Sequence, residues 1–139
     1  MMFQSLDLPT LALVLPVPPS VNHLYATVRG RRILSRDGRA YKVLVAAAVQ
    51  DWRQRNAGAA DVVAIFCHHA LSLRIVFYFA TALRRDLDGG LKITQDAVCE
   101  ALGANDNRVV DIQLSKRVDR ACPRIHVFLA ALPQQRAAV

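Results

Sequence analysis

Alternating apolar and polar positions predict the strands of this chain. In residues 71–79 every odd position from Leu71 to Phe79 is apolar, and the even positions are Ser72, Arg74, Val76 and Tyr78. Successive side chains of a strand point to opposite faces, so this pattern predicts a strand with one buried side. Further segments rich in apolar and β-branched residues predict additional strands. These segments are residues 11–15, 108–116 and 124–132.

Apolar positions at helical spacing predict two main helices. In residues 40–56 they recur every three or four positions after Ser35, a residue type that caps helix starts, and Gly58 is expected to end this helix. A second helix is expected from about Asp88 to Gly103. The pair His68 and His69 has no metal-ligand spacing and is expected at a strand edge.

The order of these elements predicts the fold class. Residues 21–35 are expected to form a loop and a short strand with a turn at Gly30, and residues 133–139 a frayed tail. The 139 residues favour a single domain. The resulting order is typical of an α/β or α+β domain, with a mixed β-sheet packed against two main helices.

Composition narrows the functional classes. Three widely spaced cysteines without a C-x-x-C pair argue against a structural zinc site and a disulfide framework, and favour a reduced, intracellular setting. The sequence shows no signal-like leader and no apolar run near the ~18 residues of a membrane span. A net charge of +7, from 18 Lys and Arg against 11 Asp and Glu, favours a polyanionic partner.

The charges are also unevenly distributed. Residues 1–60 carry eight cations and three acids, whereas residues 82–120 carry seven of each. A uniformly basic binding surface does not account for this concentration of acids. A metal site within a basic protein does.

The segment 84–92, RRDLDGGLK, concentrates the candidate chemistry. Asp86 and Asp88 lie two residues apart, and in an extended segment both project to one side, where the two carboxylates require a cation or a proton between them. Hard oxygen ligands favour Mg²⁺ or Mn²⁺ over zinc. Asp106 is the candidate third acid, and it reaches the pair only if the chain folds back after the second helix. A helix cap at Asp88 is the alternative role.

Lys92 follows Asp88 by four residues. It could stabilise charge on a phosphate during displacement, or it could form an exposed ion pair worth ~0.3–0.5 kcal/mol. Asp96 would orient Lys92 or be a plain surface acid. Basic residues around these motifs are expected to contact DNA phosphates. They are Arg29, Arg31, Arg32, Arg39, Lys42, Arg84, Arg85 and Lys116.

In their order along the chain, these motifs resemble the RusA family of Holliday junction resolvases, also called crossover junction endodeoxyribonucleases. The matching segments are LPVPPSVNHLY (15–25), RGRRILSRDGRAYK (29–42), RRDLDGGLKITQDAVCEALG (84–103) and NDNRVVDIQLSK (105–116). The resemblance implies an α/β homodimer that binds four-way DNA junctions in recombination and repair and nicks them symmetrically with Mg²⁺. It also implies a cytoplasmic, nucleoid-associated protein of bacterial or phage origin.

Carried over by position, the resemblance assigns site residues. It implies metal binding by Asp86, Asp88 and Asp106, and a catalytic role for Lys92. Two further positions, Asn22 and Asp111, match recurrent positions of the family without a firm role.

Two departures from the family pattern bear on activity. Gly89, followed by Gly90, stands where the family usually has Asn, and Asn105 stands where it often has Asp. These changes favour the alternative of a catalytically weak, structure-specific DNA-binding protein of the same fold. A D-x-D glycosyltransferase is a third hypothesis, although the chain is short for a sugar-nucleotide domain.

Overall fold

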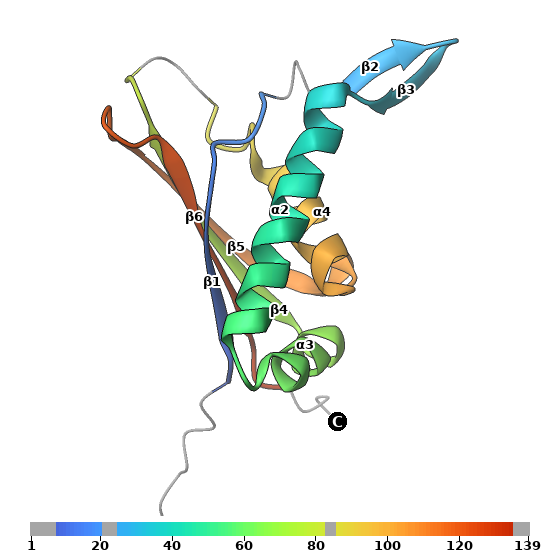
Figure 1. Cartoon of the computed structure of the whole chain (residues 1–139), viewed down its shortest axis with the longest axis vertical. Helices are drawn as coiled ribbons and strands as arrows, with labels where there is room; N and C mark the ends of the chain where they lie inside the picture. Colours follow the sequence, from blue (N-terminus) through green and yellow to red (C-terminus); the bar gives the residue numbers. More distant parts are fainter. Residues whose placement is uncertain (1–7, 21–24, 83–85, 135–139) are drawn as a thin grey trace, which may run out of the picture.

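The computed structural model describes residues 8–20, 25–82 and 86–134, and shows a mixed sheet with helices on one face and a projecting two-stranded ribbon (Figure 1). The strands of the sheet are β1 (Thr10–Leu15), β4 (Leu71–Phe79), β5 (Val109–Val118) and β6 (Arg124–Ala131). The ribbon consists of β2 (Tyr25–Val28) and β3 (Arg31–Leu34). The helical elements are α2 (Arg36–Arg55), α3 (Ala59–His68), α4 (Leu91–Leu102) and a 3-10 helix, η1 (Asp106–Arg108).

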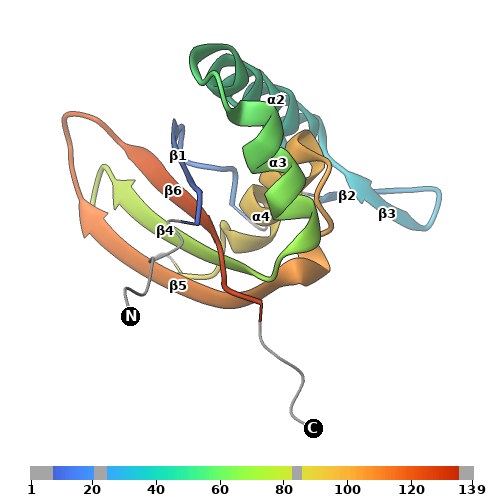
Figure 2. The ribbon, with the colours of Figure 1, turned by 90° about the horizontal axis from the view of Figure 1, so that it is seen from below.

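The sheet is mixed, as predicted. Its strand order is β1-β6-β4-β5, and β6 runs antiparallel to both of its neighbours. Strands β4 and β5 are parallel, which requires a crossover connection, and α4 lies in that connection. The predicted alternation of β4 is confirmed, because its odd positions from Leu71 to Phe79 are buried. The helices cover this buried face and leave the opposite face without a helix (Figure 2).

The first predicted helix is confirmed with its cap. The Ser35 Oγ accepts a hydrogen bond from the Gly38 N–H at 3.1 Å, and α2 ends at Arg55. The second predicted helix begins later than expected. Residues 87–90 form a turn, α4 begins at Leu91, and Gly103 ends it with a left-handed φ of 73°.

A third helix, α3, was not predicted. The expectation of two main helices is therefore wrong, as is the strand-edge position of the two histidines. His68 is the last residue of α3, and His69 caps the helix with its backbone N–H on the Ile65 carbonyl. The α3 segment is short and largely apolar, so its apolar positions show no clear helical spacing. The helix is stabilised by burial of Phe66 in the core.

The ribbon turns at Arg29 and Gly30, as the sequence indicated for Gly30. Their φ angles are 52° and 76°, so both residues are left-handed. A two-residue loop of this kind matches the right-handed twist of a hairpin. The ribbon therefore holds its basic residues away from the body of the domain (Figure 1).

The hydrophobic core lies between the sheet and the helices. Phe66 of α3, Phe77 of β4 and Ile125 of β6 are among its fully buried side chains. Across the described residues, none of the helices combines the length and the apolar character needed to cross a membrane.

Candidate active site

Asp86 and Asp88 lie in the turn between β4 and α4. Backbone hydrogen bonds of 3.1 Å join Gly89 N to the Asp86 carbonyl and Leu91 N to the Asp88 carbonyl. Both aspartates are exposed, while Leu87 between them packs against the core. Among the described residues, neither carboxylate has a hydrogen-bond or ion-pair partner. The turn therefore presents two exposed carboxylates to solvent.

Gly90 allows this turn to sit close to the core. A Cβ at Gly90 would lie 2.7 Å from the Pro18 Cγ and 2.9 Å from the Phe77 Cε1. Its φ of −105° is open to any residue, so the requirement is space and not backbone conformation. The second glycine of the D-L-D-G-G segment is thus explained by packing against the segment that follows β1.

A buried polar network holds the same turn from below. The Thr94 Oγ1 donates a hydrogen bond of 2.7 Å to the Gly90 carbonyl, and the Tyr41 hydroxyl donates one of 2.8 Å to the Pro16 carbonyl. Thr94 is completely buried. Burial raises the pKa of Tyr41, and a hydrogen bond with Thr94 partly opposes that rise, so the phenol remains a protonated donor. The network joins α2, α4 and the proline segment beneath the two aspartates.

Lys92 lies in the first turn of α4 and pairs with Asp96. The Lys92 Nζ is 3.3 Å from the Asp96 Oδ2, and 69% of the lysine side chain remains exposed. The hydrogen bond and charge of Asp96 raise the pKa of Lys92, and Tyr25 and Asp106 add to the rise. Asp88 precedes the helix, and Lys92 forms its ion pair with Asp96 and not with Asp88.

Asp106 returns toward α4 after the helix ends. The left-handed Gly103 reverses the chain, and the Gln95 Nε2 donates a hydrogen bond of 3.4 Å to the Asp106 carbonyl. The charge of Asp106 also acts on Lys92. The fold-back that the sequence left open therefore occurs, and it brings Asp106 alongside the first half of α4.

The three aspartates do not form a closed triad. Within the described part of the chain, no three Asp, Glu, His or Cys side chains are close enough to hold a metal ion as they stand. The donor chemistry nevertheless suits Mg²⁺ or Mn²⁺, because carboxylate oxygens are the only donors at these three positions. Asn105 has a local role, since its Oδ1 accepts a hydrogen bond of 3.1 Å from Asn107 N and caps η1.

An open hollow of about 260 Å³ lies beside Asp106. Lys42 of α2 forms an ion pair of 2.8 Å with Glu100 of α4 at its border. Cys99, also in its lining, is buried, and burial raises its thiol pKa to about 11. Glu100 was not predicted, and no spacing in the sequence relates it to Lys42.

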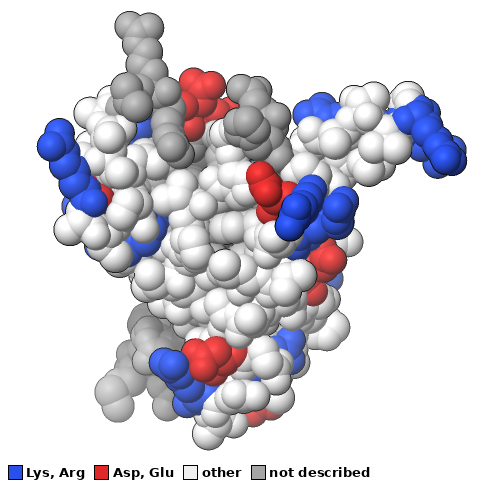
Figure 3. Space-filling view, turned by 45° about the horizontal axis from the view of Figure 1, so that its top comes forward, with Lys and Arg blue, Asp and Glu red and all other residues white. Residues whose placement is uncertain are grey.

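The basic residues predicted for phosphate contact occupy several elements. Arg29, Arg31 and Arg32 are exposed on the ribbon, and Figure 3 shows Lys and Arg side chains gathered there and near its base. The Arg32 guanidinium lies 4.3 Å from the centroid of the Tyr25 ring. Since Tyr25 also acts on Lys92, the base of the ribbon adjoins the start of α4.

The other predicted residues are dispersed. The Arg39 Nη1 donates a hydrogen bond of 2.7 Å to the Leu34 carbonyl, and Lys116 is exposed on β5. Asp111 is exposed on β5 opposite Ser72 of β4. Three further predicted residues lie outside the described part of the chain. They are Asn22, Arg84 and Arg85.

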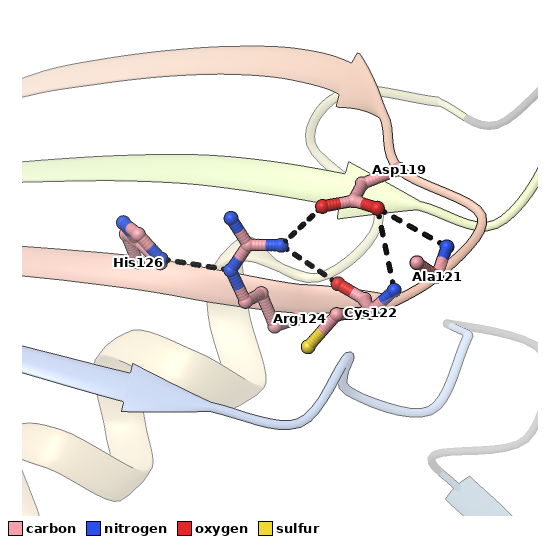
Figure 4. Close-up of polar contacts among 5 residues, drawn as sticks. All are labelled: Asp119, Ala121, Cys122, Arg124 and His126. Carbon is pink, nitrogen blue, oxygen red and sulfur yellow. Dashed lines mark hydrogen bonds and ion pairs between the residues drawn. The ribbon is translucent and has the colours of Figure 1, made fainter.

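A second charged cluster, which the sequence did not reveal, closes the turn between β5 and β6 (Figure 4). The Arg124 Nη1 donates to the Asp119 Oδ2 at 2.7 Å and to the Cys122 carbonyl at 2.8 Å. The Asp119 Oδ1 accepts hydrogen bonds from the Ala121 and Cys122 N–H groups. Arg124 also lies 4.1 Å from the Tyr78 ring centroid.

Comparison with known proteins identifies a matching family and several similar sequences. Residues 16–130 match the family model described as endodeoxyribonuclease RusA. A crossover junction endodeoxyribonuclease RusA of Escherichia coli strain K12 is 34% identical over 108 residues, covering 77% of this chain and 82% of the relative. The enzymes of the same name from Enterobacteria phage 82 and Shigella sonnei are 32% and 33% identical with the same coverage.

Proposed function

Because this chain belongs to the RusA family of endodeoxyribonucleases, we propose that it resolves four-way DNA junctions by paired, symmetric nicks that depend on Mg²⁺. Membership makes the chain an endonuclease. The junction as substrate comes from the names of its relatives, which are crossover junction enzymes from bacteria and a phage. Two symmetric cuts need two copies of the site, so the proposal includes a homodimer.

One observation carries the proposal. Two exposed carboxylates, a protonated lysine and a third aspartate lie in and around one helix, α4, of a family member. Asp86 and Asp88 would hold Mg²⁺ together with Asp106. When bound, the ion would polarise a phosphate and activate a water molecule. The match of the relatives to the same segments supports this assignment over a D-x-D glycosyltransferase.

Lys92 supplies a fixed positive charge beside these acids. The ion pair with Asp96 keeps Lys92 protonated and restricts its side chain, yet most of the side chain is exposed. A positioned ammonium group stabilises the negative charge that grows on a phosphate during displacement. Asp96 is therefore a positioning residue that acts through Lys92.

The basic ribbon supplies phosphate contacts that position the DNA. The exposed Arg29, Arg31 and Arg32 lie on a hairpin whose base adjoins the site. Such contacts add affinity that falls steeply with salt and do not read base sequence. Lys42 is engaged by Glu100, so it would reach a phosphate only after leaving that ion pair.

Cleavage of a synthetic four-way junction tests the proposal. Wild type with Mg²⁺ should nick two opposing strands, and a chelator should abolish the nicks, while linear duplex should stay intact. Asp88→Asn should bind the junction without cutting it. Asp61→Asn, an exposed acid of α3 far along the chain from the site, is the matched control and should cut normally.

Two outcomes would contradict the proposal. Normal cutting by Asp88→Asn would remove this turn from the site. Junction binding by wild type without any nicking would favour the alternative of a DNA-binding protein of the same fold, in which Gly89 and Asn105 have reduced catalysis.

A further inference from the structure

The sheet face opposite the helices, called the helix-free face below, carries the even-numbered side chains of β4 and β6 (Figure 2). The odd-numbered side chains of both strands are buried in the core, and successive side chains of a strand alternate between faces. In the register of the two strands, Arg74 lies opposite Phe128 and Tyr78 lies opposite Arg124. Directly opposite residues share a face, so these four side chains lie together on the helix-free face.

Three aromatic side chains form a row on this face. The ring centroids of Phe128 and His126 are 6.4 Å apart, and those of His126 and Tyr78 are 5.0 Å apart. An arginine lies at each end of the row. The guanidinium carbon of Arg74 is 5.8 Å from the Phe128 centroid, and that of Arg124 is 4.1 Å from the Tyr78 centroid. The row therefore combines flat π surfaces with positive charge.

Arg124 is fixed by its own chain. Its Nη1 donates to the Asp119 Oδ2 at 2.7 Å, and its Nε donates a hydrogen bond of 3.0 Å to the His126 Nε2 (Figure 4). The guanidinium is thereby held as a further flat plane in the row, and nucleic-acid bases stack on arginine planes as well as on aromatic rings. A surface whose side chains are already held in place loses less conformational entropy when it binds a ligand.

The charges around the row are mainly positive. Arg74 and Arg117 are exposed, and the register of β5 against β4 places Arg117 on the helix-free face. Two acids lie nearby. Asp119 is bonded to Arg124, and Asp111 lies six positions before Arg117 on β5, toward the other end of the strand. The two exposed arginines therefore make this face suited to an anionic ligand.

Single-stranded DNA has both chemical features that this face complements. Its phosphates suit exposed arginines, and its unpaired bases have flat faces that stack on aromatic side chains. Duplex DNA offers the phosphates, but its bases are stacked on one another and do not present their faces. An acidic peptide offers charge without a series of flat rings. A four-stranded sheet with aromatic side chains on its face is a recurrent platform for two or three stacked bases.

We propose that the helix-free face binds a short segment of single-stranded DNA. Bases stack on Phe128 and at the Tyr78 end of the row, and phosphates lie at Arg74 and Arg117. DNA is the source because the chain belongs to a family of endodeoxyribonucleases. Helix α4 lies on the other face of the sheet (Figure 2). The proposed surface is therefore a second binding site, and it does not need the Mg²⁺-dependent chemistry of the proposed function.

Binding of a fluorescent oligothymidine of about 12 nucleotides tests the stacking, by anisotropy and without Mg²⁺. Phe128→Leu keeps an apolar side chain but removes the π face, so it should weaken binding about 5-fold to 100-fold, as loss of one stacked base does. Phe128→Trp keeps the π face and should bind at least as tightly as wild type. Its added tryptophan should lose fluorescence on binding, whereas Trp52 of α2 in wild type should not.

The salt dependence of the same binding tests the phosphate contacts. Arg74→Gln should flatten the slope of log K against log salt concentration by about 0.7, the value for one contact on a single strand. Phe128→Leu should leave that slope unchanged. Arg55→Gln is the matched control, because Arg55 is an exposed arginine of α2, which packs on the other face. It should change neither the affinity nor the slope.

Several results would overturn the proposal. Wild type that does not bind the oligothymidine would remove the site. Binding that is unchanged in both Phe128→Leu and Arg74→Gln would place the single strand elsewhere, as would an unquenched tryptophan in Phe128→Trp. Equal affinity for a duplex of the same length would remove the role of unpaired bases. Tighter binding of oligouridine would make RNA the ligand, and equal displacement by a polyglutamate peptide would make the face a general anion surface.

Discussion

The turn after β4 and the turn after β5 both carry aspartates, but they use them differently. Asp119 after β5 accepts hydrogen bonds from Arg124 and from two backbone N–H groups, which together lower its pKa. Asp86 and Asp88 after β4 have no partner among the described residues. An aspartate whose carboxylate is hydrogen-bonded within its own protein stabilises a turn. An aspartate without such partners remains available to an external cation.

The two turns are also held by different groups. Asp119 closes its own turn (Figure 4). The turn with Asp86 and Asp88 is held by the contact of Gly90 with Pro18 and by the Thr94 hydrogen bond, neither of which involves the two carboxylates. The turn proposed to bind a cation is therefore supported by groups that do not compete for that ligand.

Removing one of the two exposed acids of the turn should have the largest effect. Asp86→Ala should reduce junction cleavage by more than the ~100-fold that loss of even an outer-shell metal partner costs. In wild type, Mg²⁺ at about 100 times its Kd would stabilise the fold by ~2.7 kcal/mol. Thermal unfolding with and without Mg²⁺ should show this rise in wild type and not in the variant. A Mg²⁺-dependent rise that persists in Asp86→Ala would remove Asp86 from the metal site.

Substitution of the lysine should come next. Lys92→Met should lower the single-turnover rate by about 10²–10³, with junction affinity changed far less, because the positive charge acts on the transition state. A variant that loses affinity but keeps its rate would make Lys92 a binding residue only.

Asp96→Asn tests how Asp96 acts on Lys92. The ion pair raises the pKa of Lys92 above its ordinary 10.5, so the ammonium charge is present below that pH and is lost as the pH rises through the raised value. Without the Asp96 charge, the pKa of Lys92 falls, and the alkaline limb of the pH profile of cleavage should move to lower pH. An unchanged limb, with only a uniform drop in rate, would mean that Asp96 has a structural role.

Filling the space at Gly90 should have a moderate effect on stability. Gly90→Ala places a Cβ against Pro18 and Phe77, and overpacking of this kind costs about 1–3 kcal/mol. Gly58→Ala is the matched control, because nothing lies within 4 Å of a Cβ there, and it should change the free energy of unfolding by less than about 0.5 kcal/mol. Chemical denaturation measures both. Equal stability of the two variants would show that the turn moves freely.

Asp119→Asn should have the smallest effect. Hydrogen bonds from Arg124 and Cys122 lower the pKa of Asp119 below its ordinary 3.8. Its ionised form therefore stabilises the fold above that pH, and the contribution is lost as the pH falls through the lowered value. The variant should unfold at a slightly lower temperature than wild type near neutral pH and at the same temperature in strong acid, with cleavage unchanged. Reduced cleavage would place Asp119 in the active site.

Much of the fold was predictable from local patterns. The alternation of β4, the cap at Ser35 and the turn at Gly30 follow from properties of neighbouring residues. Helix α3 was not predictable in this way, because its stability depends on burial of Phe66 against residues distant in sequence. Nor could the sequence show that β5 and β6 lie on opposite sides of β4.

For the candidate site, the sequence by itself determined the chemical types: two aspartates two residues apart, a lysine four residues after the second of them, and a third aspartate just before a strand. Spacing along a chain is enough for groups on one local element. Only the tertiary structure decided which groups meet. It brought Asp106 back beside α4 and explained Gly90 through Pro18, which lies more than seventy positions earlier. Those contacts depend on how the sheet and helices pack, and packing is a property of residues far apart in sequence.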